Sequence, residues 1–350
     1  MSSVTLITIL LIAIGSAVAA VLITVAVSSL AQAHRVRVEP TLSELRRAIV
    51  AALSGEGPQT VDALAGLNRM SERYVVNVMM DLAPSVNGTS RSILISLAED
   101  VGLLGFARVG VGSRRWSKRL YCARVLTAFG VASESQPVLL HDRSPEVRAQ
   151  AAAWCVATPG SWDIPGLVAM LGDEDGRCRF AAQDALIRIG LPAADALLHA
   201  LSGADVATTR HVLRVAAAMG DGRFFPPADA LLGDLSPVTR ALAVAVVART
   251  GDPGAGPALI DRLDDRAEEV VLAATIGLAK LGYWPGAVAV EVLLSHPTWE
   301  VRKQAGLTLL ALGPPGVVLL RASAPGVGPA AEMAEQALQL RSLSLEADAA

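Results

Sequence analysis

A short motif that recurs about every 30 residues constrains this chain more than any other feature of its sequence. The first clear copy is Asp142-Arg-Ser-Pro-Glu-Val-Arg148, and its last arginine recurs at intervals of 31, 31, 30 and 62 residues. These positions are Arg148, Arg179, Arg210, Arg240 and Arg302. Val271 lies halfway along the longest interval. Recurrence at this period indicates repeated units that bury their apolar faces by stacking on one another.

The residues between the motifs predict two helices in each unit. An Ala-rich run follows each motif and in most copies ends at a glycine, as at Gly190, Gly220 and Gly282, and a segment led by proline comes next. Glycine is favoured just after the end of a helix and proline in its first turn. The chain is 52% hydrophobic but only 4% aromatic, which suits closely packed helices better than a β-sandwich. We therefore expect an all-α fold.

The motif cores resemble those of the HEAT-repeat superfamily, specifically the short repeats of phycobilisome lyase-like proteins. The resemblance covers about 115–345. It implies an α-solenoid (α-α superhelix) of HEAT-type repeats, an armadillo-type fold. Lys118-Arg119, where Arg119 lies 29 residues before Arg148, is interpreted as an additional copy. The expected organisation is a transmembrane anchor (1–33), a helical membrane-proximal cap with degenerate repeats (34–114), the HEAT-repeat solenoid (115–345) and a tail (346–350).

The first 33 residues predict one transmembrane helix before the solenoid. Val4 to Ala31 is a run of 28 uncharged residues, which corresponds to about 42 Å of helix against about 30 Å of bilayer hydrocarbon. A cleaved signal peptide is the alternative, because Ala31-Gln32-Ala33 resembles a cleavage site, but the run is longer than a signal core and no Lys or Arg precedes it. Four arginines follow it: Arg35, Arg37, Arg46 and Arg47. The positive-inside rule then predicts a single-pass protein of the cell membrane with its N-terminus outside and its solenoid in the cytoplasm.

The charged motif residues are expected to serve the architecture. An Asp at the motif start can cap a helix, and the Arg six positions later can reach the Asp or the carbonyls of a neighbouring repeat. We expect a structural ladder along the stack: Asp142, Arg148, Asp173, Arg179, Arg210, Asp234, Arg240 and Arg302. The ladder is expected to break near Asp264, where Val271 replaces Arg and His296 replaces the next Asp. This place indicates either sequence drift, or a bend or partner site.

No residue pattern in the chain predicts catalysis, a cofactor or a metal site. Its five histidines have neither H-x-x-x-H nor His-Glu spacing, whereas iron hydroxylases with HEAT-type repeats hold their metal through His-Glu pairs. Glycine-rich phosphate loops and the G-x-S-x-G turn are also missing. Cys122, Cys155 and Cys178 lie in apolar helical stretches without C-x-x-C spacing, so they are expected to be small buried residues. We expect a protein that is not an enzyme and has no cofactor.

One segment, 108–124, has the chemical character of a binding surface. It interleaves basic and aromatic residues: Arg108, Arg114, Arg115, Trp116, Lys118, Arg119 and Arg124, with Tyr121 nearby. Such a cluster can hold the phosphates of anionic lipid or nucleic acid, or contact a partner. In the alternative interpretation, Trp116 and Tyr121 belong to the core of the first proper repeat and the arginines extend around them.

The charge of the chain is unevenly distributed. Residues 32–130 carry a net charge of +5, from 13 Lys/Arg and 8 Asp/Glu, whereas residues 131–350 carry −8, from 17 and 25. The leading hypothesis is a membrane-anchored HEAT-repeat scaffold that binds a protein partner at the cytoplasmic membrane face, and the acidic part favours a partner with a basic patch. The alternatives are a lyase-like HEAT protein acting on a bound cofactor, and nucleic-acid or lipid-phosphate binding through the basic cluster at 108–124.

Overall fold

The computed structural model describes residues 43–55, 72–203 and 205–349, with the side chains of 72–74 and 344–349 left aside. All regular secondary structure in these ranges is helical, so the expected all-α fold is confirmed for them. The predicted membrane helix, Val4 to Ala31, lies outside the described residues. Among the helices that are described, none combines the length and apolarity needed to cross a bilayer.

The chain divides into two compact units, Met1–Val131 (unit 1) and Ala132–Ala350 (unit 2). Helix α6 (Trp116–Phe129) therefore belongs to the first unit, whereas the boundary expected from the sequence fell between residues 114 and 115. The reason is that α6 packs against α5 (Leu103–Gly110) and the short turn η1 (Ala83–Ser85), both within unit 1.

Unit 1 begins, in its described part, with a helix over 43–54. Leu45, Ile49 and Leu53 on this helix are buried, as the spacing of apolar residues predicts. The Ser90 hydroxyl donates to the Leu53 carbonyl at 3.0 Å and ties the helix to the rest of the unit. The other helices of unit 1 are α3 (Glu72–Leu82), η1, α4 (Gly88–Asp100), α5 and α6.

Unit 2 alternates short and long helices. The long helices are α8 (Pro145–Ala157), α10 (Gly176–Ile189), α12 (Val206–Met219), α14 (Pro237–Val247), α16 (Glu268–Leu281) and α18 (Trp299–Ala311). The short helices are α7 (Gln136–Leu139), α9 (Ile164–Ala169), α11 (Ala194–Leu201), α13 (Phe225–Ala230), α15 (Ala255–Ile260), α17 (Ala287–Val292) and α19 (Pro314–Ser323). Single 3-10 turns flank several of them: η2 (Met170–Gly172), η3 (Leu191–Ala193), η4 (Gly222–Phe224), η5 (Leu231–Gly233), η6 (Trp284–Gly286) and η7 (Leu293–Ser295).

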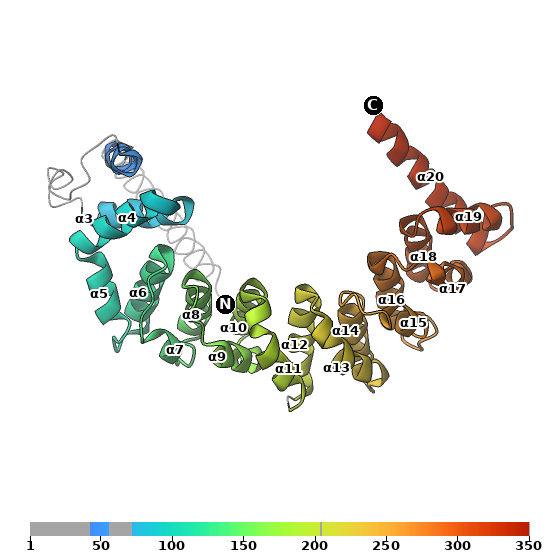
Figure 1. The fold of residues 1–350 in the computed structure, drawn as a ribbon, viewed down its shortest axis with the longest axis horizontal. Helices are drawn as coiled ribbons and strands as arrows, with labels where there is room; N and C mark the ends of the chain where they lie inside the picture. The colour runs from blue at the N-terminus through green and yellow to red at the C-terminus, as the bar shows by residue number, and fades with distance from the viewer. Residues whose placement is uncertain (1–42, 56–71, 204, 350) are drawn as a thin grey trace, which may run out of the picture. The chain divides into compact units, whose positions relative to one another are not determined.

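Each long helix packs against the next long helix along unit 2. Figure 1 shows the long helices side by side along the concave side of unit 2 and the short helices along the opposite side. The position nine residues after the start of the motif is a fully buried alanine in five copies: Ala151, Ala182, Ala243, Ala274 and Ala305. A methyl group at this point lets adjacent helices approach closely, and the stacked faces form one continuous core. We call the exposed side of the long helices the inner face.

Glycine ends several of the long helices. Gly282 follows α16 with φ 64°, and Gly220 follows α12 with φ 66°. Only glycine adopts this left-handed conformation at little cost, so the chain turns there into the next short helix.

The last helix is longer than the sequence indicated. Helix α20 runs from Pro329 to Ala349, so the expected tail at 346–350 is helical as far as the structure describes it. Helix α20 packs against α18 and α19 and covers the last repeat.

Candidate functional site

The motif forms the same tight turn in each of its best copies. The carboxylates of Asp142, Asp173 and Asp234 each accept the backbone N–H two residues later, at 2.8 Å in every case. The donor residue is the one that precedes the long helix, so the aspartate closes the turn before the helix and does not cap the helix itself. The expectation that these aspartates cap free helical N–H groups is therefore wrong.

The motif arginine folds back onto its own turn. Nη1 of Arg148, Arg179, Arg240 and Arg302 donates to the carbonyl six residues earlier at 2.7 to 2.9 Å. Arg119 makes the same bond with the Ser113 carbonyl at 2.8 Å, and the Ser113 hydroxyl takes the place of the aspartate by accepting the Arg115 N–H. This shared geometry identifies 113–119 as a further copy of the motif, and it makes Arg119 a structural residue.

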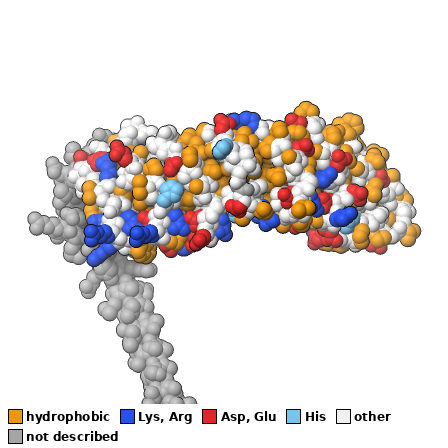
Figure 2. Space-filling model, turned by 90° about the horizontal axis from the view of Figure 1, so that it is seen from below, with side chains coloured by type: hydrophobic (Ala, Val, Ile, Leu, Met, Phe, Trp, Pro, Cys, Tyr) orange, Lys and Arg blue, Asp and Glu red, His pale blue; other side chains and the backbone are white. Residues whose placement is uncertain are grey.

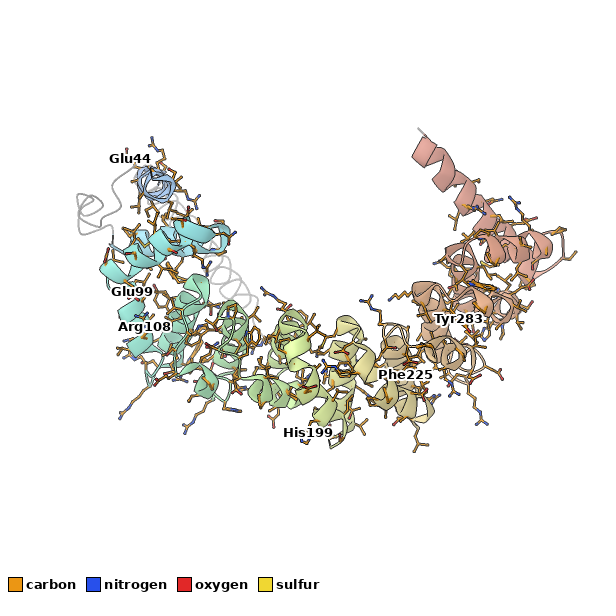
Figure 3. The ribbon with its side chains drawn as sticks, in the orientation of Figure 1. Glu44, Glu99, Arg108, His199, Phe225 and Tyr283 are labelled. Carbon is orange, nitrogen blue, oxygen red and sulfur yellow. The ribbon has the colours of Figure 1, made fainter. Side chains whose placement is uncertain are left out.

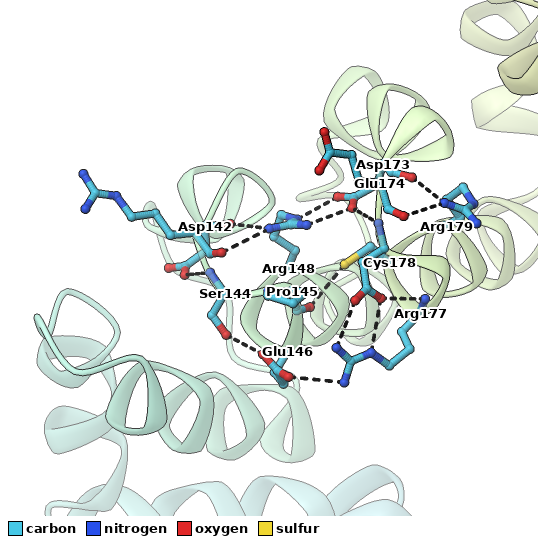
Figure 4. Close-up of polar contacts among 12 residues, drawn as sticks. Asp142, Ser144, Pro145, Glu146, Arg148, Asp173, Glu174, Arg177, Cys178 and Arg179 are labelled. Atoms are coloured by element: carbon cyan, nitrogen blue, oxygen red, sulfur yellow. Dashed lines mark hydrogen bonds and ion pairs between the residues drawn. The ribbon is translucent and has the colours of Figure 1, made fainter.

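Two of these arginines also hold the next repeat (Figure 4 shows the first). Arg148 donates Nε and Nη2 to the carboxylate of Asp173, at 2.7 and 2.8 Å. Arg240 makes the same bidentate contact with Asp265, at 2.9 and 2.7 Å. All four side chains are largely buried. Hydrogen bonding to the guanidinium lowers the pKa of Asp173 and of Asp265, so both carboxylates are ionised near neutral pH.

Asp265 is a residue that the sequence analysis missed, because it placed the motif start at Asp264. The interval from Arg148 to Asp173 is 25 residues, and Arg240 to Asp265 repeats it. Asp265 also closes the turn, because its carboxylate accepts the Ala267 N–H at 2.9 Å. A signal was present, since Asp265 lies 31 residues after Asp234, but the arginine that would have marked the register is Val271 here.

The next contact of this type would join positions 271 and 296, and both of its members are replaced. Val271 is 2% exposed, and His296 keeps only the turn, with its Nδ1 accepting the Thr298 N–H at 3.1 Å. The loss of one charged member thus accompanies the loss of the other. Arg210 departs from the pattern in another way and donates to the hydroxyls of Ser236 and Thr239 in the following repeat.

A second polar network lies at the exposed ends of α8 and α10. Arg177 bonds the carboxylate of Asp175 and reaches Glu146 of the preceding repeat at 3.2 Å (Figure 4). The Arg177 hydrogen bond lowers the pKa of Asp175 to about 2. These groups are solvent-exposed, so their attraction is screened and contributes little to stability.

Apolar side chains are exposed on three of the long helices at the inner face. Phe180 of α10 is 72% exposed, and Val238 of α14 and Leu307 of α18 are also exposed. Leu272 and Ile276 of α16 lie half-buried between them along the chain. Apolar groups spread over several helices form the kind of surface that repeat arrays offer to protein partners.

A histidine lies among donors on two neighbouring long helices. The Gln183 side-chain nitrogen lies 2.8 Å from Nδ1 of His211, and Arg214 Nη1 lies 3.3 Å from the same atom. Both neighbours donate, so Nδ1 accepts and the ring proton resides on Nε2. Burial and then the nearby Arg214 charge lower the pKa of His211, which keeps the ring neutral at pH 7.

The predicted basic cluster at 108–124 separates into two groups in the structure. Nη2 of Arg108 forms an ion pair with Oε1 of Glu99 at 2.6 Å (Figure 3 labels both residues), and Arg119 donates to the carbonyls of its own turn. The other members are exposed: Arg114, Arg115, Trp116, Lys118 and Arg124. Figure 2 shows Lys and Arg side chains close together on the surface of the described part of unit 1.

The aromatic residues of this cluster do not lie in a core. Trp116 is 50% exposed and Tyr121 40%, so the interpretation that they form the interior of a repeat is wrong. Trp116 is the first residue of α6, the position that Trp299 holds in α18 and that proline holds in α8 and α14. The Lys118 ammonium lies 4.8 Å from the ring centroid of Phe106, which is also exposed.

The three cysteines are buried and unpaired, as expected of small core residues. Burial raises the pKa of the Cys122, Cys155 and Cys178 thiols, so they are protonated near neutral pH. Within the ranges the structure describes, His, Cys, Asp and Glu side chains form no group of three or more that could hold a metal ion.

Comparison with known proteins identifies the repeats. The HEAT-repeat family matches residues 136–219 and 226–309, so the chain carries HEAT repeats over these ranges. No curated protein sequence matches the chain.

Several solved structures are similar in fold. Importin beta is 13% identical with a TM-score of 0.48, over 73% of this chain and 43% of that one. Kap95p is 11% identical with a TM-score of 0.49, over 86% of this chain and 51% of that one. The complex of CpcE and CpcF of phycocyanin lyase from Nostoc sp. is 20% identical with a TM-score of 0.34, over 67% and 93%. The chain thus spans about half or less of the importin beta and Kap95p chains.

Proposed function

We propose, from the premise that this chain carries HEAT repeats, that it is a membrane-anchored scaffold that binds a protein partner at the cytoplasmic face of the membrane. The array presents the partner with its inner face, and the chain catalyses no reaction. The anchor is the uncharged segment from Val4 to Ala31, oriented by the arginines that follow it.

The observation that carries the proposal is the set of exposed apolar side chains on the long helices α10, α14 and α18. Phe180, Val238 and Leu307 come from three different repeats, so one ligand that covers them must extend along the array. The bidentate pairs Arg148–Asp173 and Arg240–Asp265 fix adjacent repeats relative to each other. A pre-organised surface loses little conformational entropy on binding, which favours affinity.

The charge of unit 2 indicates the chemistry of the partner. Residues 131–350 carry −8, and acidic side chains such as Glu269 and Glu300 are exposed in the first turns of α16 and α18. A partner segment with apolar side chains on one side and Lys or Arg at its margins complements this surface.

The experiment that tests the scaffold is partner retention by matched surface variants of the full chain, extracted in mild detergent. Phe180→Asp combined with Leu307→Asp places charge on the inner face, and we expect at least about tenfold weaker retention of the co-purified partner, because two apolar contacts are lost. The control pair is Val138→Asp with Val318→Asp, exposed positions on the short helices α7 and α19. A partner that leaves the control and stays with the inner-face variant contradicts the proposal.

The anchor is tested separately. A chain inserted through Val4 to Ala31 stays with membranes in alkaline carbonate, and protease added outside intact cells leaves the repeats undigested. If alkaline carbonate extracts the chain from membranes, the proposed anchor is wrong. If protease added outside intact cells digests the repeats, the proposed orientation is wrong.

A further inference from the structure

The hairpin of α5 and α6 in unit 1 exposes apolar and basic groups together. Val109 is 81% exposed and Phe106 and Trp116 about half, and all three adjoin the turn between the two helices in sequence. Arg114, Arg115 and Lys118 are exposed in and just after the same turn. We call these six residues the hairpin edge.

Close packing makes the hairpin edge a rigid surface. A Cβ at Gly110 would overlap the Cys122 sulfur, so the last residue of α5 packs directly against the middle of α6. Arg119 donates to the carbonyls of Ser113 and Arg114 and holds the turn. The apolar groups of the edge therefore cannot withdraw into the unit without breaking its packing.

The composition of the hairpin edge matches the surface of an anionic bilayer. Aromatic rings prefer the level of the head groups, aliphatic side chains gain from the acyl boundary, and Lys and Arg are attracted to anionic lipid. Lys118 stacked over Phe106 carries its charge on an apolar ring, which suits the same boundary. Nucleic acid would use the charges, but it offers no apolar boundary to the exposed aliphatic side chain of Val109.

The predicted anchor holds the hairpin edge near a membrane. Only the eleven residues 32–42 separate the end of the uncharged segment from the helix that begins at 43, and eleven extended residues span at most about 40 Å. A tether this short gives the edge a high effective concentration at the lipid surface, so weak contacts suffice.

We infer that the hairpin edge docks on the anionic surface of the bilayer that holds the anchor, with Trp116, Val109 and Phe106 at the head-group level and Arg114, Arg115 and Lys118 on lipid phosphates. This inference rests on the membrane anchor of the proposed function. Docking fixes unit 1 against the membrane, and it assigns the exposed members of the basic cluster to lipid.

The test uses the full chain reconstituted into phosphatidylcholine vesicles, with or without phosphatidylserine, whose acyl chains carry bromine. Bromine quenches tryptophan fluorescence on contact, and a Trp116→Phe variant isolates the share of Trp116. We expect Trp116 to be quenched in the phosphatidylserine vesicles and not in phosphatidylcholine alone, and high salt to abolish the quenching.

Charge removal provides the matched comparison. Arg114→Ser, Arg115→Ser and Lys118→Ser together should weaken docking by about 100-fold, because each basic residue near the surface contributes roughly fivefold. The control is Arg143→Ser, Arg249→Ser and Arg266→Ser, three exposed arginines of unit 2 with the same change of charge, which should leave Trp116 quenched. Equal quenching in both lipids, or in the two triple variants, overturns the inference.

The anchor and the docking fail in different ways. Wild-type chain that floats with vesicles in alkaline carbonate while its Trp116 is unquenched in neutral buffer overturns docking and leaves the anchor. Chain that does not float overturns the anchor. A single-stranded oligonucleotide that changes Trp116 emission where phosphatidylserine vesicles do not assigns the edge to nucleic acid and overturns lipid docking.

Discussion

Arg240 of α14 donates two hydrogen bonds, of 2.9 and 2.7 Å, to the carboxylate of Asp265 and so connects one repeat to the next. One repeat further on, the equivalent positions hold Val271 and His296. Losing only the aspartate would leave an arginine buried without its counter-charge, which is costly. The two replacements occur together, and the stack continues there without a bidentate ion pair. Val270 and Val301 are fully buried at this junction, and the Thr308 hydroxyl donates to the Thr275 carbonyl at 3.1 Å.

Asp265→Ala should destabilise unit 2 by about 2 kcal/mol, since Arg240 then loses a largely buried charged acceptor. Urea denaturation followed by circular dichroism measures the change. Asp264→Ala is the matched control, because Asp264 is exposed and its replacement should change stability by less than about 0.5 kcal/mol. The reverse order of the two effects would show that the register is shifted by one residue.

The missing contact between positions 271 and 296 should be restorable. Val271→Arg alone buries an unpaired charge and should cost about 2 to 3 kcal/mol. His296→Asp alone should be nearly neutral, because aspartate closes this turn in the other copies. Combined, the two substitutions should recover at least about 1 kcal/mol as coupling energy in a double-mutant cycle of unfolding free energies. Strict additivity would show that the backbone at this junction differs from that at Arg240.

His211 should make stability depend on pH below neutrality. Its pKa is lower in the folded protein than the usual value of about 6.5. Between these two values the unfolded chain binds more protons, so stability is present above pH 6.5 and falls as the pH is lowered toward the folded pKa. His211→Gln should make the melting temperature depend less steeply on pH. Melting temperatures measured between about pH 7.5 and pH 5 check this, and the wild-type protein should begin to lose stability at about pH 6.5. An unchanged slope in the His211→Gln variant would contradict this prediction.

Two glycines of unit 1 should respond to alanine with opposite signs. Gly130 follows α6 with φ 61°, where a Cβ is strained, so Gly130→Ala should cost about 1 kcal/mol. Gly105 lies inside α5 with open space around the position of a Cβ, so Gly105→Ala should stabilise by about 0.5 to 1 kcal/mol. Thermal melting of the two variants checks this. Loss of stability in both would mean that α5 is strained at Gly105.

Much of the repeat architecture could be predicted from the sequence, because its signals are local. The spacing of apolar residues, the proline at Pro165 and the glycine at Gly282 determine where helices begin and end within a few residues of chain. The motif arginines were identified for the same reason. The start of the motif was wrongly assigned to Asp264. Asp264 and Asp265 are adjacent, and the motif arginine that would identify Asp265 as the start is replaced by Val271.

The candidate binding surface was predicted only as a set of residues. Arg108 and Arg119 are of a residue type that often binds ligands. In the structure Arg108 pairs with Glu99, and Arg119 donates to backbone carbonyls. Trp116 resembles a core residue by type, because large aromatic side chains usually bury most of their surface. Its exposure depends on how α5 and α6 pack, which spacing along one helix does not describe.

The sequence by itself determined the period of the repeat, the all-α character of the described chain and the turn at each motif, because helix propensity, caps and turn bonds act between residues a few positions apart. The tertiary structure alone decided that Arg240 pairs with Asp265 and that Trp116 faces solvent. Both facts depend on which helices stack and at what distance, and stacking is set by packing between segments some 25 residues apart, where the smallness of residues such as Ala243 and Gly110 matters more than local pattern.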